Sequence, residues 1–322
     1  MKALVCREWG PPESLRIEDV PDPVPGPGQV RVRVMACGLN FLDTLIIQGK
    51  YQVRPPLPFS PGVEIAGVVD AVGPGVDQPR VGDRVAAMLQ WGGLAELAVT
   101  DAAGTLPIPP GMDFDVAASF AVAYGTSHLA LTHRANLKAG ETLLVLGAAG
   151  GVGLTAVEIG RKLGARVIAA ASSPEKLAVA KAHGADELID YTREDLRERL
   201  KALGGADVVY DPVGGDLFEQ ALRGIKWEGR VLVVGFASGK IPQVAANLLL
   251  VKNASLVGVF WGAYRQQNPG VLMSGLGELI RWHAEGAIRP LVSATYPLAR
   301  AADAITDLAG RRAVGKLVVT MT

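Results

Sequence analysis

The pattern of apolar and polar positions changes character about one third of the way along the chain. Residues 29–35, QVRVRVM, alternate apolar and polar side chains with the period of a half-buried strand. Residues 63–73 and 82–88 follow a similar pattern, with glycines at the breaks. Proline-rich stretches at 21–28 and 55–62 require loops, because proline fixes φ and lacks an N–H group. The first third therefore predicts an antiparallel, barrel-like β domain.

Apolar strands alternate with helices in the middle of the chain. Residues 115–134 have helical apolar spacing, and from residue 142 onward the order strand, glycine loop, helix recurs. Strands are predicted at 142–147, 166–171, 186–191, 206–215 and 229–236, and helices at 151–164, 174–184, 194–205 and 216–225. This alternation predicts a parallel, doubly wound sheet. The strand-like end, residues 315–321, is expected to return and pair with the N-terminal β domain.

Composition narrows the possible function classes. A length of 322 residues fits about two domains, and the 32 basic residues balance the 32 acidic ones. A chain with zero net charge has no excess of positive charge that would attract nucleic acid or an anionic membrane. The two cysteines, Cys6 and Cys37, cannot build a disulfide framework or a four-thiolate zinc site. No apolar run approaches the about 18 residues of a membrane span, and we expect a cytoplasmic protein without a signal peptide.

The segment 144–160, LVLGAAGGVGLTAVEIG, joins a strand to a helix through a glycine turn. Its core, Ala148-Ala149-Gly150-Gly151-Val152-Gly153, is a variant of the dinucleotide fingerprint in which Ala148 replaces the first glycine. Gly150 would let backbone approach a pyrophosphate, Gly153 would let the helix pack on the strand, and the helix start attracts phosphate. A tight turn in an unrelated α/β domain is the alternative, but the βα units that follow favour a nucleotide.

The end of the second strand of this domain bears on the choice between NADH and NADPH. NAD-binding proteins usually place an Asp or Glu there, whereas this strand ends Ala170-Ala171-Ser172-Ser173. No carboxylate at that point repels a 2′-phosphate, Ser172 and Ser173 offer hydroxyl donors, and Lys176 can pair with the phosphate. Glu175 counts against this interpretation, and Lys176 could be an ordinary solvated lysine. The pattern favours NADPH.

The chain resembles a known family over almost its whole length. The resemblance is carried by residues 2–51, residues 61–76 (PGVEIAGVVDAVGPGV) and residues 147–170, in that order along the chain. They resemble the medium-chain dehydrogenase/reductase superfamily and, within it, the zinc-free quinone oxidoreductases, the zeta-crystallin-like branch. The resemblance implies an α/β fold with a doubly wound parallel-sheet (Rossmann) NADPH-binding domain and a GroES-like β-barrel catalytic domain. The expected ranges are 1–122 for the first part of the catalytic domain, 123–264 for the Rossmann domain and 265–322 for a C-terminal return to the catalytic domain.

The zinc ligands of related alcohol dehydrogenases are missing. Those enzymes carry a cysteine where this chain has Asn40 and a histidine where it has Val63, and their structural zinc needs four clustered cysteines. We therefore expect no metal site and no metal Lewis acid to polarise the substrate. Hydride addition to a quinone or to the β-carbon of an enone needs less such help, because conjugation spreads the developing negative charge.

The catalytic candidates come mainly from the resemblance. It places Asn40 beside the nicotinamide and Tyr51 near the substrate, with Asp43 on the same segment, and Thr126 matches a threonine that faces the nicotinamide. A helix cap, a local ion pair and a packing residue are the ordinary alternatives for Asn40, Asp43 and Tyr51. Many relatives have a tyrosine where this chain has Leu45, which suggests a more apolar pocket.

Further cofactor contacts are expected in loops that follow strands, because doubly wound sheets bind ligands at the carboxyl ends of their strands. Gly214, Phe236 and Ser238 occupy such loops. The resemblance adds Tyr191 and Arg311 as positions that hold the adenosine phosphate in NADPH-using relatives. Arg311 is equally explained as surface charge beside Arg312.

The leading hypothesis is an NADPH-dependent reductase that transfers hydride to a small electrophile, a quinone or an α,β-unsaturated carbonyl compound. One alternative is an acrylyl- or enoyl-CoA reductase, for which Arg265, Arg281 and Arg289 are only suggestive. Another is an NADPH-binding regulatory or structural protein with little turnover. The family pairs an edge strand like residues 255–262 across a homodimer, and an internal strand is the alternative.

Overall fold

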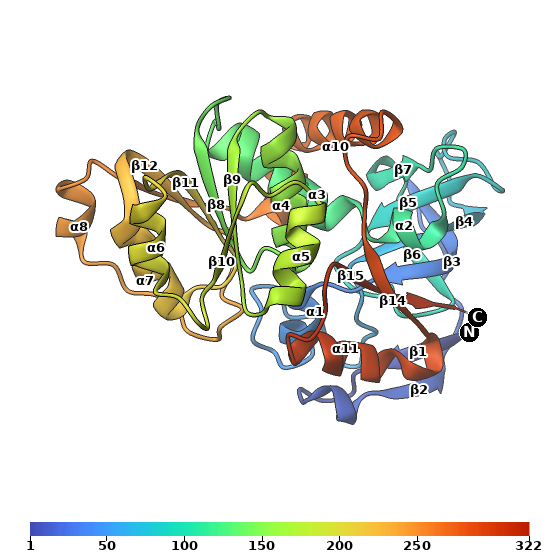
Figure 1. The fold of residues 1–322 in the computed structure, drawn as a ribbon. Helices are drawn as coiled ribbons and strands as arrows, with labels where there is room; N and C mark the ends of the chain where they lie inside the picture. The colour runs from blue at the N-terminus through green and yellow to red at the C-terminus, as the bar shows by residue number, and fades with distance from the viewer. Residues whose placement is uncertain (322) are drawn as a thin grey trace. The chain divides into compact units, whose positions relative to one another are not determined.

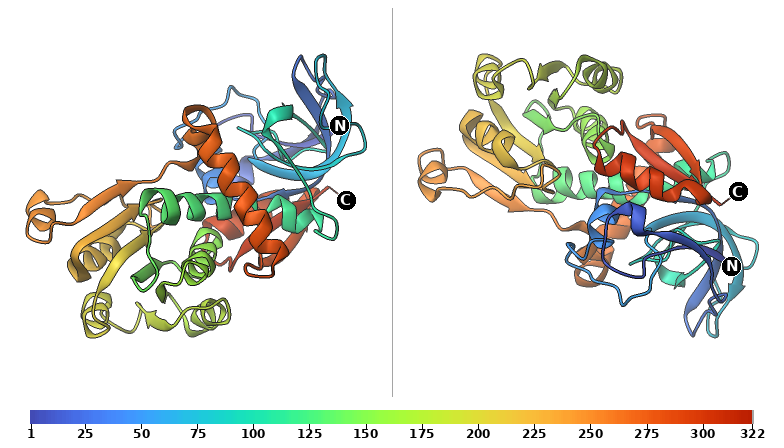
Figure 2. Two further views of the ribbon diagram at one scale, coloured as in Figure 1. Left: turned by 90° about the horizontal axis from the view of Figure 1, so that it is seen from above. Right: turned by 90° about the horizontal axis from the view of Figure 1, so that it is seen from below.

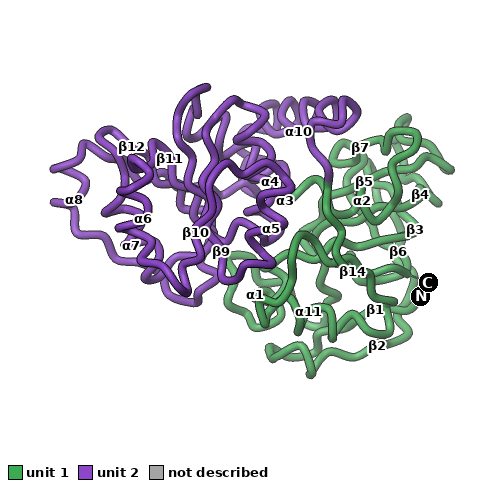
Figure 3. Tube along the Cα trace, viewed as in Figure 1, with its two compact units in different colours: residues 1–122, 290–322 green, residues 123–289 purple. Residues whose placement is uncertain are grey.

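The structure is a computed structural model that describes residues 1–321, and these residues divide into two compact units, coloured separately in Figure 3. Unit 1 comprises Met1–Val122 and the segment from Pro290 onward, and unit 2 comprises Ala123–Arg289. The helix α10 (Pro269–Ala284) lies wholly within unit 2. Unit 1 therefore resumes later in the chain than the expected residue 265.

Unit 1 is built on a seven-stranded sheet in the order β14-β15-β3-β4-β5-β7, with β6 also paired to β3. Its strand pairs are antiparallel except for the parallel pair β14 and β15, and β1 and β2 form a separate antiparallel pair. The strands are β1 (Lys2–Val5), β2 (Arg16–Asp19), β3 (Gln29–Gly38), β4 (Glu64–Val72), β5 (Arg84–Met88), β6 (Leu97–Asp101), β7 (Thr105–Pro107), β14 (Val292–Pro297) and β15 (Lys316–Thr320). The helices are α1 (Phe41–Ile46), α2 (Phe114–Ala118) and α11 (Ala301–Ala309). The expected β domain is confirmed.

Strand β3 organises this sheet. Its valines are buried and its arginines are at least partly exposed, which is the alternation that the sequence predicted. β3 is long enough to pair with β6 along its first half and with β15 at its end, where Val318 lies opposite Gly38. The expected return of the terminal strand is therefore confirmed. Because Gly38 also lies opposite Glu64 of β4, this return brings the ends of three strands together.

Unit 2 contains a six-stranded parallel sheet in the order β10-β9-β8-β11-β12-β13. The strands are β8 (Thr142–Leu146), β9 (Arg166–Ala171), β10 (Glu187–Asp190), β11 (Ala206–Asp211), β12 (Ile225–Val233) and β13 (Ser255–Gly258). The helices are α3 (Ala121–His128, which begins in unit 1), α4 (Gly151–Lys162), α5 (Pro174–Ala182), α6 (Leu196–Ala202), α7 (Gly215–Gly224), α8 (Ala246–Leu250), α9 (Tyr264–Gln267) and α10.

The helices of unit 2 cover both faces of its sheet. α4 and α5 pack on one face, and α6 and α7 pack on the other (Figure 1). All five residues of the central strand β8 are accordingly buried. The strand order reverses between β8 and β11, which is the switch point where doubly wound sheets bind their ligands. The predicted doubly wound parallel sheet is confirmed.

β13 lies at the edge of this sheet and pairs with β12, so it is not an internal strand. Figure 2 shows the neighbouring α8 segment at the outer end of unit 2. No helix among residues 1–321 has the length and apolar character needed to cross a membrane.

The region 115–134 differs from the single helix that its apolar spacing predicted. It is divided into α2, α3 and a π-helix over Leu129–Arg134. The hydroxyl of Ser119 donates to the carbonyl of Val116, and the carboxylate of Glu64 accepts from the backbone N–H of Val122. The nearby Ser119 thus supplies a partner where one helix ends, and Glu64, which is distant in the sequence, supplies one where the next begins.

Two helical glycines of unit 2 have opposite surroundings. A Cβ atom at Gly153, in the first turn of α4, would lie 2.2 Å from the carbonyl oxygen of Gly147. The same atom at Gly277, on the exposed side of α10, would have nothing within 4 Å. Gly153 is therefore required by helix packing, whereas Gly277 only adds entropy to the unfolded chain.

We expect Gly153→Ala to lower the free energy of unfolding by about 2–3 kcal/mol, because backbone must move to admit the methyl group. Gly277→Ala should raise it by about 0.5–1 kcal/mol. Urea denaturation followed by tryptophan fluorescence measures both variants. Equal effects of the two substitutions would contradict this difference in packing.

Candidate functional site

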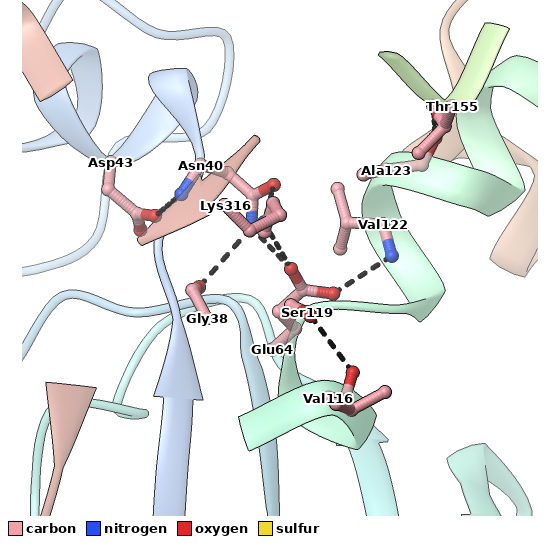
Figure 4. Close-up of polar contacts among 10 residues, drawn as sticks. All are labelled: Gly38, Asn40, Asp43, Glu64, Val116, Ser119, Val122, Ala123, Thr155 and Lys316. Carbon is pink, nitrogen blue, oxygen red and sulfur yellow. Dashed lines mark hydrogen bonds and ion pairs between the residues drawn. The ribbon is translucent and has the colours of Figure 1, made fainter. Parts of the chain in front are cut away.

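The first cluster lies in unit 1, where β3, β4 and β15 meet (Figure 4). The ammonium of Lys316 lies 2.6 Å from Oε1 of Glu64 and 2.7 Å from Oδ1 of Asn40. Nδ2 of Asn40 donates to the same Glu64 oxygen at 2.9 Å. Asn40 is 8% exposed, Lys316 6% and Glu64 1%, so an ion pair and an amide share a site nearly free of water.

The backbone around Asn40 is fixed by close packing. A Cβ atom at Gly38 would lie 1.9 Å from the carbonyl oxygen of Ala118, so only glycine fits there. Asn40 immediately precedes α1, and Oδ2 of Asp43 accepts from its backbone N–H at 2.8 Å. Oδ1 of Asp43 accepts from the N–H of Gly62 at 3.2 Å. Asp43 therefore joins the start of α1 to the loop before β4.

Burial changes the acidity of two candidates on this segment. Asp43 has no exposed surface, and burial raises the pKa of its carboxyl to about 7, although the N–H groups of Asn40 and Gly62 and the charge of Lys316 oppose the rise. Burial, and then the negative charge of Asp43, raise the pKa of Tyr51 above its ordinary value. The phenol of Tyr51 thus keeps its proton at neutral pH and can donate a hydrogen bond.

The second cluster lies at the carboxyl end of β8 in unit 2. Gly147 has φ of +60°, the N–H of Ala148 donates to the carbonyl of Ala170, and α4 begins after Gly150. A Cβ atom at Gly150 would meet only the carbonyl oxygen of Gly147, at 3.4 Å, so its surroundings are open where those of Gly153 are closed. Residues 148–153 thus form a strand–turn–helix start of the kind that binds a pyrophosphate.

The end of β9 brings Ser172, Ser173 and Lys176 together. The ammonium of Lys176 donates to the hydroxyl of Ser172 at 3.2 Å, and the hydroxyl of Ser173 caps α5 by accepting from the N–H of Lys176. Glu175 is exposed, and a hydrogen bond from Ser173 lowers the pKa of its carboxyl. Tyr191 follows β10 and donates its N–H to the carbonyl of Ala171. The predicted phosphate-binding residues of unit 2 therefore adjoin one another.

The loops after β11 and β12 also lie side by side. Gly214, with φ of +70°, would place a Cβ atom 3.2 Å from the ring of Phe236, and the N–H of Ser238 donates to the carbonyl of Val213. Asp211 accepts from the N–H groups of Val213 and Gly214, and burial raises the pKa of its carboxyl to about 6. The sequence analysis did not single out Asp211, although its place at a strand end marks it.

Thr126 is presented by a helix that is tied to the glycine turn. The hydroxyl of Ser127 lies 2.9 Å from the carbonyl oxygen of Val152 and 2.8 Å from the hydroxyl of Tyr210. The hydroxyl of Tyr124 donates to the buried carboxylate of Glu158. Every residue of 121–130 is buried except Thr126, which is partly exposed. The contacts of its neighbours thus leave Thr126 as the accessible side chain of α3.

The predicted residues therefore fall into two groups. Unit 1 holds Asn40, Asp43 and Tyr51 together, and it also contains Arg311, which follows α11 with φ of +56°. Unit 2 brings the other candidates to the carboxyl edge of its sheet or to α3. Glu64 and Lys316 were missed by the sequence analysis. A charged residue at the start of an apolar strand was the available indication in both cases.

Comparison with known proteins identifies the class. Residues 26–110 match the alcohol dehydrogenase GroES-like domain, and residues 151–274 match the zinc-binding dehydrogenase family. A quinone oxidoreductase-like protein 2 from Bos taurus is 43% identical over 325 residues, which cover 99% of this chain and 92% of that protein. The fold and these matches define a two-domain dehydrogenase or reductase.

Solved structures agree. The quinone oxidoreductase of Thermus thermophilus, solved alone and with NADPH, is 37% identical with a TM-score of 0.86 and covers 100% of both chains. The Escherichia coli quinone oxidoreductase, solved with NADPH, is 30% identical with a TM-score of 0.92 and covers 99% of this chain and 100% of that one. The chain belongs to the quinone oxidoreductases, the zinc-free branch of the medium-chain dehydrogenase/reductase superfamily.

The residues of unit 1 do not fit the catalytic zinc of the alcohol dehydrogenases. Asn40 and Val63 replace the cysteine and histidine ligands, and the neighbouring Glu64 is committed to the ammonium of Lys316. Within residues 1–321 no group of three or more His, Cys, Asp or Glu side chains is placed to hold a metal ion.

The raised pKa of Asp43 predicts a pH-dependent stability. An unfolded Asp titrates near 3.9, so between that pH and about 7 the folded protein holds a proton that the unfolded chain has lost. The contribution of this group to the free energy of unfolding is therefore fully present at low pH. It is lost progressively as the pH rises through about 7. Relative to Asp43→Ala, the wild type should lose about 2–3 kcal/mol of unfolding free energy between about pH 5 and 7. Urea denaturation across this range measures it, and a pH-independent difference would be the contrary result.

Proposed function

We propose that this protein is an NADPH-dependent, zinc-independent reductase that transfers a hydride to quinones or α,β-unsaturated carbonyl compounds. The observation that carries the proposal is the carboxyl edge of the unit 2 sheet. An open glycine turn follows β8. Ser172 and Ser173 follow β9, Lys176 lies in the first turn of α5, and no carboxylate stands at the end of β9. Relatives of the same family are solved with NADPH.

The proposed cofactor site follows the order of the strands. Ala148, Gly150, Gly151, Val152 and Gly153 would hold the pyrophosphate at the start of α4. Ser172, Ser173, Lys176, Tyr191 and Arg311 would hold the adenosine phosphate, and Gly214, Phe236 and Ser238 would make further contacts. Lys176 donates to Ser172, which supports a role for its ammonium as the cation that pairs with a 2′-phosphate beside these serines.

The unit 1 cluster would act on the electrophile. When bound, the reduced nicotinamide supplies the hydride. Asn40 and the neutral phenol of Tyr51 would donate hydrogen bonds to the oxygen on which negative charge develops. Asp43 has no exposed surface, so it would act through Asn40, because its carboxylate accepts a hydrogen bond from the backbone N–H of Asn40. Thr126 would contact the nicotinamide from α3.

Consumption of NADPH by the purified protein tests this function. The assay compares a small quinone, a simple enone and acrylyl-CoA, each with NADPH and with NADH. We expect turnover of the quinone or the enone, with NADPH preferred. Turnover of acrylyl-CoA alone would move the substrate class to thioesters. NADPH binding without turnover of any acceptor would contradict a reductase.

The cofactor preference is tested in the same assay by Lys176→Glu, which places a negative charge where the 2′-phosphate is proposed. We expect its KM for NADPH to rise about 10-fold or more while the KM for NADH changes little. Lys181→Glu is the matched control, because Lys181 is an exposed lysine on the same helix that donates to the carbonyl of Asp186. Equal effects of the two variants would remove Lys176 from the site.

A homodimer through the edge strand β13 is part of the proposal. β13 is the last strand of its sheet and pairs on one side only, with β12, while the carbonyl of Gly258 accepts from the guanidinium of Arg134. Close to it in the chain, Leu250 is 76% exposed and Val251 62% exposed, and Ile241 is 73% exposed. Exposed apolar side chains in the segment that leads into an edge strand favour a second copy of this chain as the occupant. Two buried free cysteines, Cys6 and Cys37, support a reducing, cytoplasmic location.

Light scattering after size-exclusion chromatography tests the dimer. We expect the wild type to be a dimer and Leu250→Lys/Val251→Lys to be a monomer, because two ammonium groups cannot be buried unpaired. Val81→Lys, at a site in unit 1 that is 61% exposed, is the control and should remain a dimer. A monomeric wild type, or a double variant that stays dimeric, would rule out this interface.

A further inference from the structure

The amide of Asn40 can be held in only one of its two orientations. A lysine ammonium only donates hydrogen bonds and a carboxylate only accepts them. Lys316 therefore fixes Oδ1 of Asn40 at 2.7 Å, and Oε1 of Glu64 fixes Nδ2 at 2.9 Å. A reversed amide would set its NH₂ group against the ammonium and its oxygen against the carboxylate.

One of the two N–H donors of the fixed amide is only weakly hydrogen-bonded. The other hydrogen bond from Nδ2 of Asn40 runs to the carbonyl of Gly38 at 3.4 Å, which is long for an N–H donor. Oε2 of Glu64 is occupied by the N–H of Val122, so this carboxylate cannot turn away from Asn40 without losing a partner. The weakly used N–H is therefore the part of Asn40 that can serve a ligand.

Stability alone does not account for the ion pair. Removing two charges from water costs several kcal/mol per ion, and uncharged residues of similar size often serve equally well. Lys316 and Glu64 are both nearly inaccessible to water, and both contact Asn40. What this pair supplies and an apolar pair would not is a defined direction for the amide.

We infer that Lys316 and Glu64 are positioning residues, which act on the reaction by aiming the N–H of Asn40 that is only weakly bonded to Gly38 at the acceptor oxygen. The inference rests on the proposed function. No bond to Lys316 or Glu64 forms or breaks, and neither residue touches the substrate. The pair affects the rate through the orientation of one donor.

A mutant cycle tests the inference. Lys316→Met alone leaves a buried, unpaired carboxylate and should be strongly destabilised, so the informative variant is Lys316→Met/Glu64→Gln, which removes both charges. We expect it to fold, to lose about 10- to 100-fold in kcat with the acceptor that the wild type reduces, and to keep its KM for NADPH. In an Asn40→Ala background the same two changes should alter kcat by less than about twofold, since no amide remains to be aimed.

The matched control removes another ion pair of the same sheet. Arg31 and Asp70 join β3 and β4 at 2.9 Å and 3.1 Å, and Arg31→Met/Asp70→Asn should leave kcat unchanged. If Lys316→Met/Glu64→Gln reduces kcat equally with and without Asn40, the pair is merely structural and the inference fails. A wild type without turnover would instead overturn the proposed function.

A second measurement, by NMR, does not depend on whether Lys316→Met/Glu64→Gln folds. The side-chain NH₂ resonances of Asn40, identified in the wild-type NMR spectrum by their loss in Asn40→Ala, should exchange with solvent far more slowly than those of exposed asparagines. Exchange as fast as that of exposed side chains would overturn the inference.

Discussion

A lysine and a glutamate almost inaccessible to water join three strand ends that are far apart in the sequence. Lys316 begins β15, Glu64 begins β4, and Asn40 follows β3, so their contact requires the terminal strand to return to the N-terminal sheet. An ion pair at such depth tolerates little displacement, because either charge left alone would cost several kcal/mol. The backbone near Asn40 is correspondingly tight, and Gly38 has no room for a methyl group. Unit 1 thus holds one amide rigidly.

In unit 2 the candidate site is formed by loops at one edge of a parallel sheet rather than by a buried ion pair. Its parallel strands all end at one edge, so the glycine turn after β8 and the serines after β9 become neighbours without a long-range ion pair. Hydrogen bonds of Ser127 then tie α3 to the start of α4, which leaves Thr126 accessible. Backbone geometry and helix starts suit a phosphorylated cofactor, whereas the unit 1 cluster suits a small oxygen acceptor. Each set of groups thus suits one reactant of the proposed hydride transfer.

The sequence predicted the fold well because periodicity is local. Alternation at 29–35 and the repeated strand–loop–helix order were sufficient for both sheets, and the A-x-G-x-x-G turn identified the start of α4. The breaks in 115–134 were not predictable, because a cap from the distant Glu64 contributes to them. For the same reason Lys316 and Glu64 escaped notice, since only the pairing of β15 with β3 brings them to Asn40. The burial that raises the pKa of Asp43 is likewise a tertiary property.

The most direct test of the central claim is to follow the hydrogen itself. The protein would be supplied with NADPH that carries deuterium at the transferable position of the nicotinamide, together with a simple enone, and the product would be examined by mass spectrometry and NMR. Direct hydride transfer predicts a saturated carbonyl product with one deuterium at the former β-carbon. Product without deuterium at that carbon, or reduction of neither the enone nor a small quinone although NADPH is bound, would contradict the proposed reductase.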